Sequence, residues 1–137
     1  MVAPQKNIRT TIVNGRGGVM PPFPQLDNKQ IVDVTNYVRS LSGLPADDLR
    51  VTRGAEVFKA NCVACHGVDG KGNIVLGAPN LTDKTWLYGS SEVVIIETIT
   101  KGRMAMMPAQ DKVLSSEKIH LLTAYVWGLS NNKSAAK

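Results

Sequence analysis

The chain has 137 residues, the size of one ordinary domain, and a formal net charge of +5 at pH 7. Its basic residues are scattered, without a basic run or interleaved aromatic residues. This argues against a nucleic-acid partner and weakly favours an acidic protein partner or a position near a membrane. No apolar stretch approaches the length of a membrane-spanning helix, and Met1 to Pro4 lack the charged and apolar regions of a signal peptide.

The first third of the chain predicts an extended segment followed by a helix. Pro21, Pro22 and Pro24 keep the backbone before the helix extended. Asp27 and Gln30 form the sequence pattern of a capping box, and Gly43 is placed to end the helix. One face of this helix is apolar, at Ile31, Val34, Val38 and Leu41.

Further helices are predicted downstream. Asp47 or Asp48 can cap a helix that runs through Val57 and Phe58. Gly70 to Gly77 reads as a loop. The next helix starts at Ser90-Ser91-Glu92 and stops at Gly102, although its β-branched interior, residues 93–99, has the propensity of a strand.

The last helix is capped by Ser115 and carries Glu117 in its first turn. His120 and Trp127 fall on one side of it. We expect the opposite face to pack, and that face holds Leu114, Lys118, Leu121, Leu122, Tyr125 and Leu129.

Between the second and third of these helices lies the run Cys62-Val63-Ala64-Cys65-His66, which has the C-x-x-C-H pattern of c-type haem attachment. Two thiols at this spacing can form thioethers with the two vinyl groups on one edge of a porphyrin. His66 then lies under the iron as its proximal ligand. The run contains both cysteines of the chain and one of its two histidines. It therefore predicts one covalently bound haem.

Three other interpretations of the run fit less well. A redox dithiol would need a βαβ setting, whereas the flanks read as a helix end and a glycine-rich loop. A disulfide would close almost no chain. Zinc could have four ligands in Cys62, Cys65, His66 and His120, but the adjacent Cys65 and His66 suit a tetrahedral site poorly.

The chain also contains an incomplete repeat. Residues 11–21 and 98–108 share the pattern T-I-x-x-G-R-x-x-x-M-P at an offset of 87, and after one extra residue Ile31 and Tyr37 match Ile119 and Tyr125. The first copy has no C-x-x-C-H. We therefore predict that residues 1–44 are the C-terminal half of a first domain, residues 45–131 a complete one-haem domain, and residues 132–137 a flexible tail. Because haem c is attached outside the cytoplasm, a chain without a signal is expected to have been processed or cut from a longer protein.

A haem that carries electrons needs a second axial ligand, and a thioether favours the ferrous iron. Met104, Met106 and Met107 lie at a suitable distance after His66. Met107 is the predicted ligand, because it precedes Pro108 and aligns with Met20 in the repeat. His120 is the alternative, although its helix face argues against it.

Several of these motifs, in order, resemble those of class I cytochrome c. They are Gly54-x-x-x-Phe58, Cys62-x-x-Cys65-His66-Gly67, Gly77-Ala78-Pro79-Asn80-Leu81 and Met107-Pro108. Residues 77–89 and 119–130 further resemble the second haem domain of the dihaem subunit (subunit III) of cbb3-type cytochrome c oxidase, and residues 9–43 the end of its first haem domain. The resemblance implies an all-α class I cytochrome c fold around one covalent haem c, preceded by a partial cytochrome c repeat. The membrane anchor and the first C-x-x-C-H of that subunit are missing, so Met20 resembles a ligand that has no iron here.

The resemblance also implies roles for individual residues. Pro79 would accept a hydrogen bond from His66 Nδ1, and Leu81 would pack on the haem. Gly54 and Phe58 would meet Tyr125 where the first and last helices of the domain cross. Other positions remain open: Arg103 is either a propionate partner or a solvent-facing arginine, Trp86 and Tyr88 either donate to propionates or close the pocket edge, and Trp127 is either a partner contact or, as we expect, covered by the N-terminal segment.

The predicted function is single-electron transfer, from a donor cytochrome c towards the oxygen-reducing subunit of a cbb3-type oxidase. The chain itself is expected to do no bond chemistry. The location implied is the periplasmic side of a bacterial inner membrane, with membrane contact only through the parent complex. The alternatives are a free-standing periplasmic carrier, a haem gas sensor or peroxidase-like enzyme with a displaceable methionine, and a structural docking module. The N-terminal segment could also swap between two chains to form a homodimer.

Overall fold

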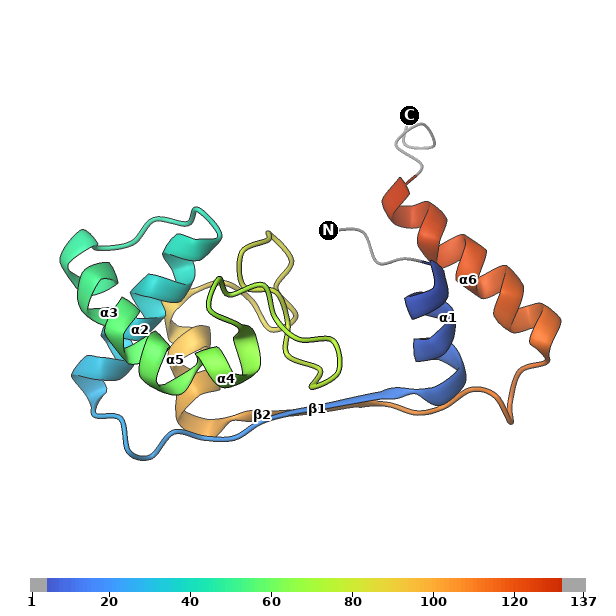
Figure 1. Cartoon of the computed structure of the whole chain (residues 1–137), viewed down its shortest axis with the longest axis horizontal. Coiled ribbons are helices and arrows are strands. Elements are labelled where there is room, and N and C mark those ends of the chain that lie inside the picture. The colour runs from blue at the N-terminus through green and yellow to red at the C-terminus, as the bar shows by residue number, and fades with distance from the viewer. Residues whose placement is uncertain (1–4, 132–137) are drawn as a thin grey trace. The chain divides into compact units, whose positions relative to one another are not determined.

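The computed structural model describes residues 5–131, and these form mostly helices with one small two-stranded sheet (Figure 1). They divide into two compact units. The central unit is Gly18–Ala105, and the terminal unit consists of the residues up to Gly17 together with those from Met106 onward. This division differs from the boundary after residue 44 that the repeat predicts, so that boundary stays a prediction.

The sheet departs from the all-α prediction. Strand β1 (Arg16–Met20) pairs with strand β2 (Arg103–Met107), and the boundary between the units falls within both strands. These strands are the two copies of the repeat around its Gly-Arg and Met-Pro positions. Extended backbone was predicted at Pro21, Pro22 and Pro24, whereas strand β1, which directly precedes them, and its pairing with β2 were not predicted from the sequence.

The central unit contains helices α2 (Asn28–Leu41), α3 (Asp48–Asn61), α4 (Val63–His66) and α5 (Glu92–Lys101). Helix α2 packs against both α3 and α5 (Figure 1). Val34 of α2 and Phe58 of α3 are almost completely buried. The core of the unit consists of Leu26, Ile31, Val34, Val38, Phe58, Ile95 and Ile99.

The ends of these helices lie where the sequence predicts them. Asp27 and Gln30 form both hydrogen bonds of the capping box at the start of α2. Asp47 caps α3, and Ser91 caps α5. Gly102 ends α5 with a φ of +73°, a conformation that a residue with a Cβ rarely adopts. Residues 93–99 are thus helical despite their β-branched side chains.

At the closest approach in the central unit, α3 meets α2. A Cβ added to Gly54 would lie 2.1 Å from Asp33 O, so only glycine fits at this crossing. The ring of Phe58 lies 5.1 Å from that of Tyr37, centroid to centroid. The expected partner, Tyr125, is 65% exposed instead. The prediction was wrong. Tyr37 holds the position in the first repeat copy that Tyr125 holds in the second, and its helix, α2, is separated from α3 only by residues 42–47.

Polar contacts also hold α2 in this place. Arg53 of α3 donates two hydrogen bonds to Asp33, at 2.7 and 2.8 Å, and the Asp33 side chain is only 6% exposed. Arg39 donates to the backbone carbonyls of Pro45 and Ser90. Asn36 Oδ1 accepts from the backbone N–H of Asp47, at 3.1 Å. These contacts tie α2 to α3 and to the segment before α5.

The terminal unit pairs α1 (Gln5–Asn14) with α6 (Ser116–Asn131). Ile12, Ile119 and Thr123 are its buried helical residues among those described. The face of α6 that was expected to pack is largely exposed: Leu121 is 68%, Tyr125 65% and Leu129 67% exposed. That prediction was wrong because α2 covers α3, and α6 packs against α1 through a different stripe. Within residues 5–131, no helix combines the length and apolar character needed to cross a membrane.

The close approach of α3 to α2 predicts that one methyl group added at Gly54 destabilises the protein. Gly54→Ala should lower the free energy of unfolding by about 1–3 kcal/mol, because the new Cβ would overlap Asp33 O and outweigh any gain in helix propensity. Urea unfolding of the haem-loaded protein, followed by circular dichroism, measures this. Gly17→Ala is the control, because nothing lies within 4 Å of its added Cβ. An unchanged midpoint for Gly54→Ala would contradict the crossing.

The Asp33–Arg53 pair predicts a pH dependence. The hydrogen bonds from Arg53 lower the pKa of Asp33 from its usual 3.8. Because this pKa is lower in the folded than in the unfolded protein, the ionised carboxylate stabilises the fold. This stabilisation is complete at pH values above 3.8 and is lost as the pH falls through the folded-state pKa. Asp33→Asn should therefore unfold at lower urea than the wild type at neutral pH, and this difference should shrink below pH 3.8. Glu56→Gln, which removes an exposed carboxylate of α3, should show no such convergence.

Candidate haem-binding site

The C-x-x-C-H run sits at the end of α3. Cys62 ends α3, where its N–H donates to Phe58 O at 2.8 Å, and it also begins the single turn of α4. Gly67 ends α4 with a φ of +79°. Cys62 is half-buried, Cys65 is exposed, and both thiols are free. The core residue Phe58 thus fixes the position of the run through one turn of backbone.

His66 is the buried member of the run, with 8% of its surface exposed. Its Nδ1 lies 3.1 Å from Pro79 O, the contact that the family resemblance implied. With Nδ1–H donating to this carbonyl, the lone pair on Nε2 is left for another partner. Burial lowers the pKa of His66, and the Pro79 carbonyl opposes this shift only in part. The imidazole is therefore kept neutral, as a metal ligand must be.

The loop after the run carries Pro79 back to His66. The N–H of Gly72 donates to His66 O at 2.8 Å, and the N–H of Leu81 donates to Gly70 O at 2.7 Å. Gly72 has a φ of +82°, and a Cβ there would lie 2.7 Å from Pro79 O. A bare backbone at Gly72 is what allows the Pro79 carbonyl to reach the imidazole.

The surroundings of the Cys62 thiol disfavour its thiolate form. Burial raises the pKa of Cys62 to about 11, and the neighbouring Cys65 adds to this. Cys62 is therefore protonated at neutral pH, whereas zinc binding and redox exchange use the thiolate. Among residues 5–131, no three His, Cys, Asp or Glu side chains are grouped to hold a metal ion. Two thiols one helical turn apart, next to a neutral histidine, are the groups that covalent attachment of haem c and ligation of its iron require.

Four other predicted site residues belong to the central unit. Leu81 and Trp86 are partly buried against its core. Tyr88 is 47% exposed, and the guanidinium of Arg103 lies 4.3 Å from its ring centroid. Arg103 also donates to Thr98 Oγ1 at 2.9 Å. Arg103 and Tyr88 thus form a pair, and their contact with a propionate stays a prediction.

The methionines are distributed over both units. Met107, the predicted axial ligand, is in the terminal unit and 39% exposed, while His66 is in the central unit. Met104 and Met106 are 78% and 80% exposed. Met20 is partly buried against the central core, which Cys62 also contacts. Iron ligation by Met107 therefore stays a prediction.

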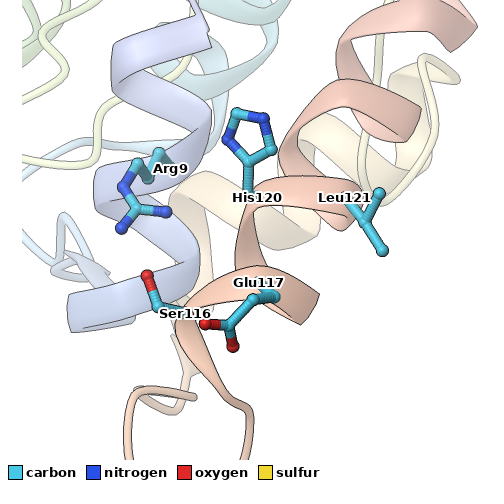
Figure 2. Close-up of a pocket in the computed structure, with 5 residues that line it drawn as sticks. All are labelled: Arg9, Ser116, Glu117, His120 and Leu121. Carbon is cyan, nitrogen blue, oxygen red and sulfur yellow. The ribbon is translucent and has the colours of Figure 1, made fainter.

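His120, the alternative ligand, lies in the terminal unit. It is exposed and lines a shallow pocket with Arg9, Ser116, Glu117 and Leu121 (Figure 2). Arg9 comes from α1 and the other four from α6. Trp127, further along α6, is half-buried. Among the contacts of the described residues, neither His120 nor Trp127 has one that points to a cofactor.

The model of one protein family, described as cytochrome c oxidase, cbb3-type, subunit III, matches residues 49–126. The chain belongs to this family. It is 48% identical over 120 residues to cbb3-type cytochrome c oxidase subunit FixP of Bradyrhizobium sp. (strain ORS 278), which covers 87% of this chain and 39% of the relative. It is 44% identical over 131 residues to subunit CcoP of Rubrivivax gelatinosus, covering 94% of this chain and 43% of the relative.

A third relative, FixP of Bradyrhizobium diazoefficiens, is 51% identical over 109 residues, 79% of this chain and 38% of the relative. The chain therefore spans less than half the length of these relatives. Family membership implies a cytochrome c-type domain with covalently bound haem c. When bound, this haem supplies the one-electron redox chemistry. Cys62, Cys65 and His66 are the residues of this chain that would hold it.

The loop geometry predicts how His66 tunes the iron. Gly72→Ala should displace the Pro79 carbonyl from Nδ1, make the imidazole less basic, and so raise the reduction potential of the haem. Redox titration measures the shift. Gly43→Ala is a matched control, because Gly43 has a φ of +74° but no atom within 4 Å of an added Cβ. Equal shifts in both variants, or a fall in potential, would contradict the proposed role of Pro79.

Proposed function

We propose that this chain carries single electrons on one covalently bound haem c towards the oxygen-reducing subunit of a cbb3-type oxidase. The observation that carries the proposal is the buried, neutral His66, held by Pro79 O within one turn of two free thiols. Haem with one histidine and one thioether ligand is six-coordinate, which suits electron transfer and leaves no open position for a substrate. The sequence favours Met107 as the thioether.

The partners proposed are a donor cytochrome c and the catalytic subunit of the oxidase, on the periplasmic side of a bacterial inner membrane. The relatives support the oxidase partner, since they are named as subunits of cbb3-type oxidases. Exposed apolar side chains after the run offer a contact surface close to the haem site, at Val68, Ile74, Val75 and Leu76. A homodimer through the N-terminal segment also remains a proposal, although α2 already has partners within its own chain.

The test is spectroscopic. The haem should stay with the denatured polypeptide, because it is held by thioethers, and Cys62→Ser or Cys65→Ser should leave a single thioether. The native protein should give a low-spin c-type spectrum, including the weak far-red band of methionine-ligated ferric haem. Carbon monoxide should not bind the native ferrous protein. A high-spin spectrum together with carbon monoxide binding would refute the carrier function and support a gas sensor or enzyme.

A further inference from the structure

A hairpin turn in the loop after α4 begins and ends on His66. The N–H of Gly72 donates to His66 O at 2.8 Å, and Pro79 O lies 3.1 Å from His66 Nδ1. Between these two contacts, Asn73 and Ala78 pair through both of their backbone hydrogen bonds, at 2.9 and 3.0 Å. The tip of the turn is therefore held next to the residue that would bind the iron.

The tip of this turn carries apolar side chains into solvent. Asn73 Oδ1 accepts hydrogen bonds from the N–H groups of Val75 and Leu76, at 2.9 and 3.3 Å, and so holds the backbone of the tip in shape. Val75 is 93% exposed, and Ile74 and Leu76 are also exposed. We call Ile74, Val75 and Leu76 the apolar turn. Because turns favour Gly, Asn, Asp, Ser and Pro, neither the backbone nor the core explains three apolar side chains here.

The loop that carries the apolar turn is electrically neutral. Residues 67–81 contain two charged side chains, Asp69 and Lys71, and these form an ion pair at 3.4 Å. The central unit, residues 18–105, has nine Lys or Arg and nine Asp or Glu side chains. The net charge of +5 therefore comes from residues outside this unit. The acidic partner that the net charge favours is not favoured at this surface.

These features suit a partner that docks only briefly. An electron donor has to bind and leave in every turnover, and such redox encounters use small interfaces. A surface without net charge steers neither an acidic nor a basic partner from a distance, so association depends on apolar contact. A turn that is already held in shape loses little conformational freedom on docking. A subunit that stays assembled needs a larger interface than this turn provides.

We propose that the apolar turn is the docking site of the electron donor, and that the donor presents an uncharged, apolar surface around its own haem. This inference rests on the proposed function and adds to it the place and the chemistry of the donor contact. One electron passes from the ferrous donor, which becomes ferric, to the ferric haem of this chain, which becomes ferrous. No bond forms or breaks in this step.

The experiment measures the second-order rate constant for reduction of the haem-loaded ferric protein. The reductant is a ferrous one-haem cytochrome c with an uncharged surface around its haem. Val75→Asp and Val75→Lys should each lower the rate constant about tenfold, because either charge would lose its water on docking. For the wild type, the rate constant should change by less than about twofold between low and physiological salt.

Leu49→Asp and Leu49→Lys are the matched controls. Leu49 is also exposed, at 73%, but it lies about 20 Å from Cys62 along α3. These variants should keep the wild-type rate constant. Because the Val75 side chain is almost wholly in solvent, its variants should keep the wild-type urea midpoint and reduction potential, so a slower reaction reports docking.

Four outcomes would overturn the proposal. The first is equal rate constants in the Val75 and Leu49 variants. The second is electrostatic docking, seen as opposite effects of aspartate and lysine at position 75 or as a steep loss of rate with salt. The third is unchanged reduction by the donor with lost turnover in the assembled oxidase, which would assign the turn to the catalytic subunit. The fourth is a wild-type dimer in sedimentation that Val75→Asp abolishes, which would assign it to a second copy.

Failure of the proposed function gives a different result. A wild-type protein without covalent low-spin haem would refute the proposed function, whatever the rate constants of the variants. A low-spin haem that is reduced equally fast in all five proteins would refute only the docking site. The two failures are therefore distinguishable.

Discussion

The close approach of α3 to α2 at Gly54 is the contact on which the rest of the central unit depends. Because Gly54 has no Cβ, the backbone of α2 at Asp33 lies directly on α3, and this brings Tyr37 against Phe58. The carbonyl of Phe58 in turn accepts a hydrogen bond from the N–H of Cys62, which places the C-x-x-C-H turn at the end of α3. A packing contact between two helices thus determines where the two thiols and His66 stand.

The features predicted correctly from the sequence are those that neighbouring residues determine. Asp27 with Gln30, Asp47, and Ser91 each hydrogen-bond backbone groups within three residues, so a short stretch of sequence is enough to identify them. The same holds for the glycine-rich loop, while haem attachment by the run at residues 62–66 stays a prediction. The β-branched interior of α5 shows that such end signals, combined with burial of Ile95 and Ile99, outweigh intrinsic strand propensity.

The pairing of helices could not be predicted in this way. The apolar positions of α2 and α6 are nearly the same, so hydrophobic periodicity indicates that each can pack but not which one packs on α3. The choice depends on Asp33, Asn36 and Arg39, whose partners become evident only when α2, α3 and the segment before α5 are together. The contact between His66 Nδ1 and Pro79 O was predicted from the sequence and is present, whereas the second axial ligand stays a prediction.

The pairing of β1 with β2 has a consequence for how this fold can be connected. In the repeat, the helix after the Met-Pro segment comes last, but in the central unit its equivalent, α2, comes first and leads into α3. Compared with the one-haem domain predicted at residues 45–131, the central unit therefore has its helices in a circularly permuted order, and its ends at Gly18 and Ala105 fall in paired strands. A tandem repeat contains such a permutant without any change in sequence. A tandem repeat can in this way connect equivalent helices in two different orders.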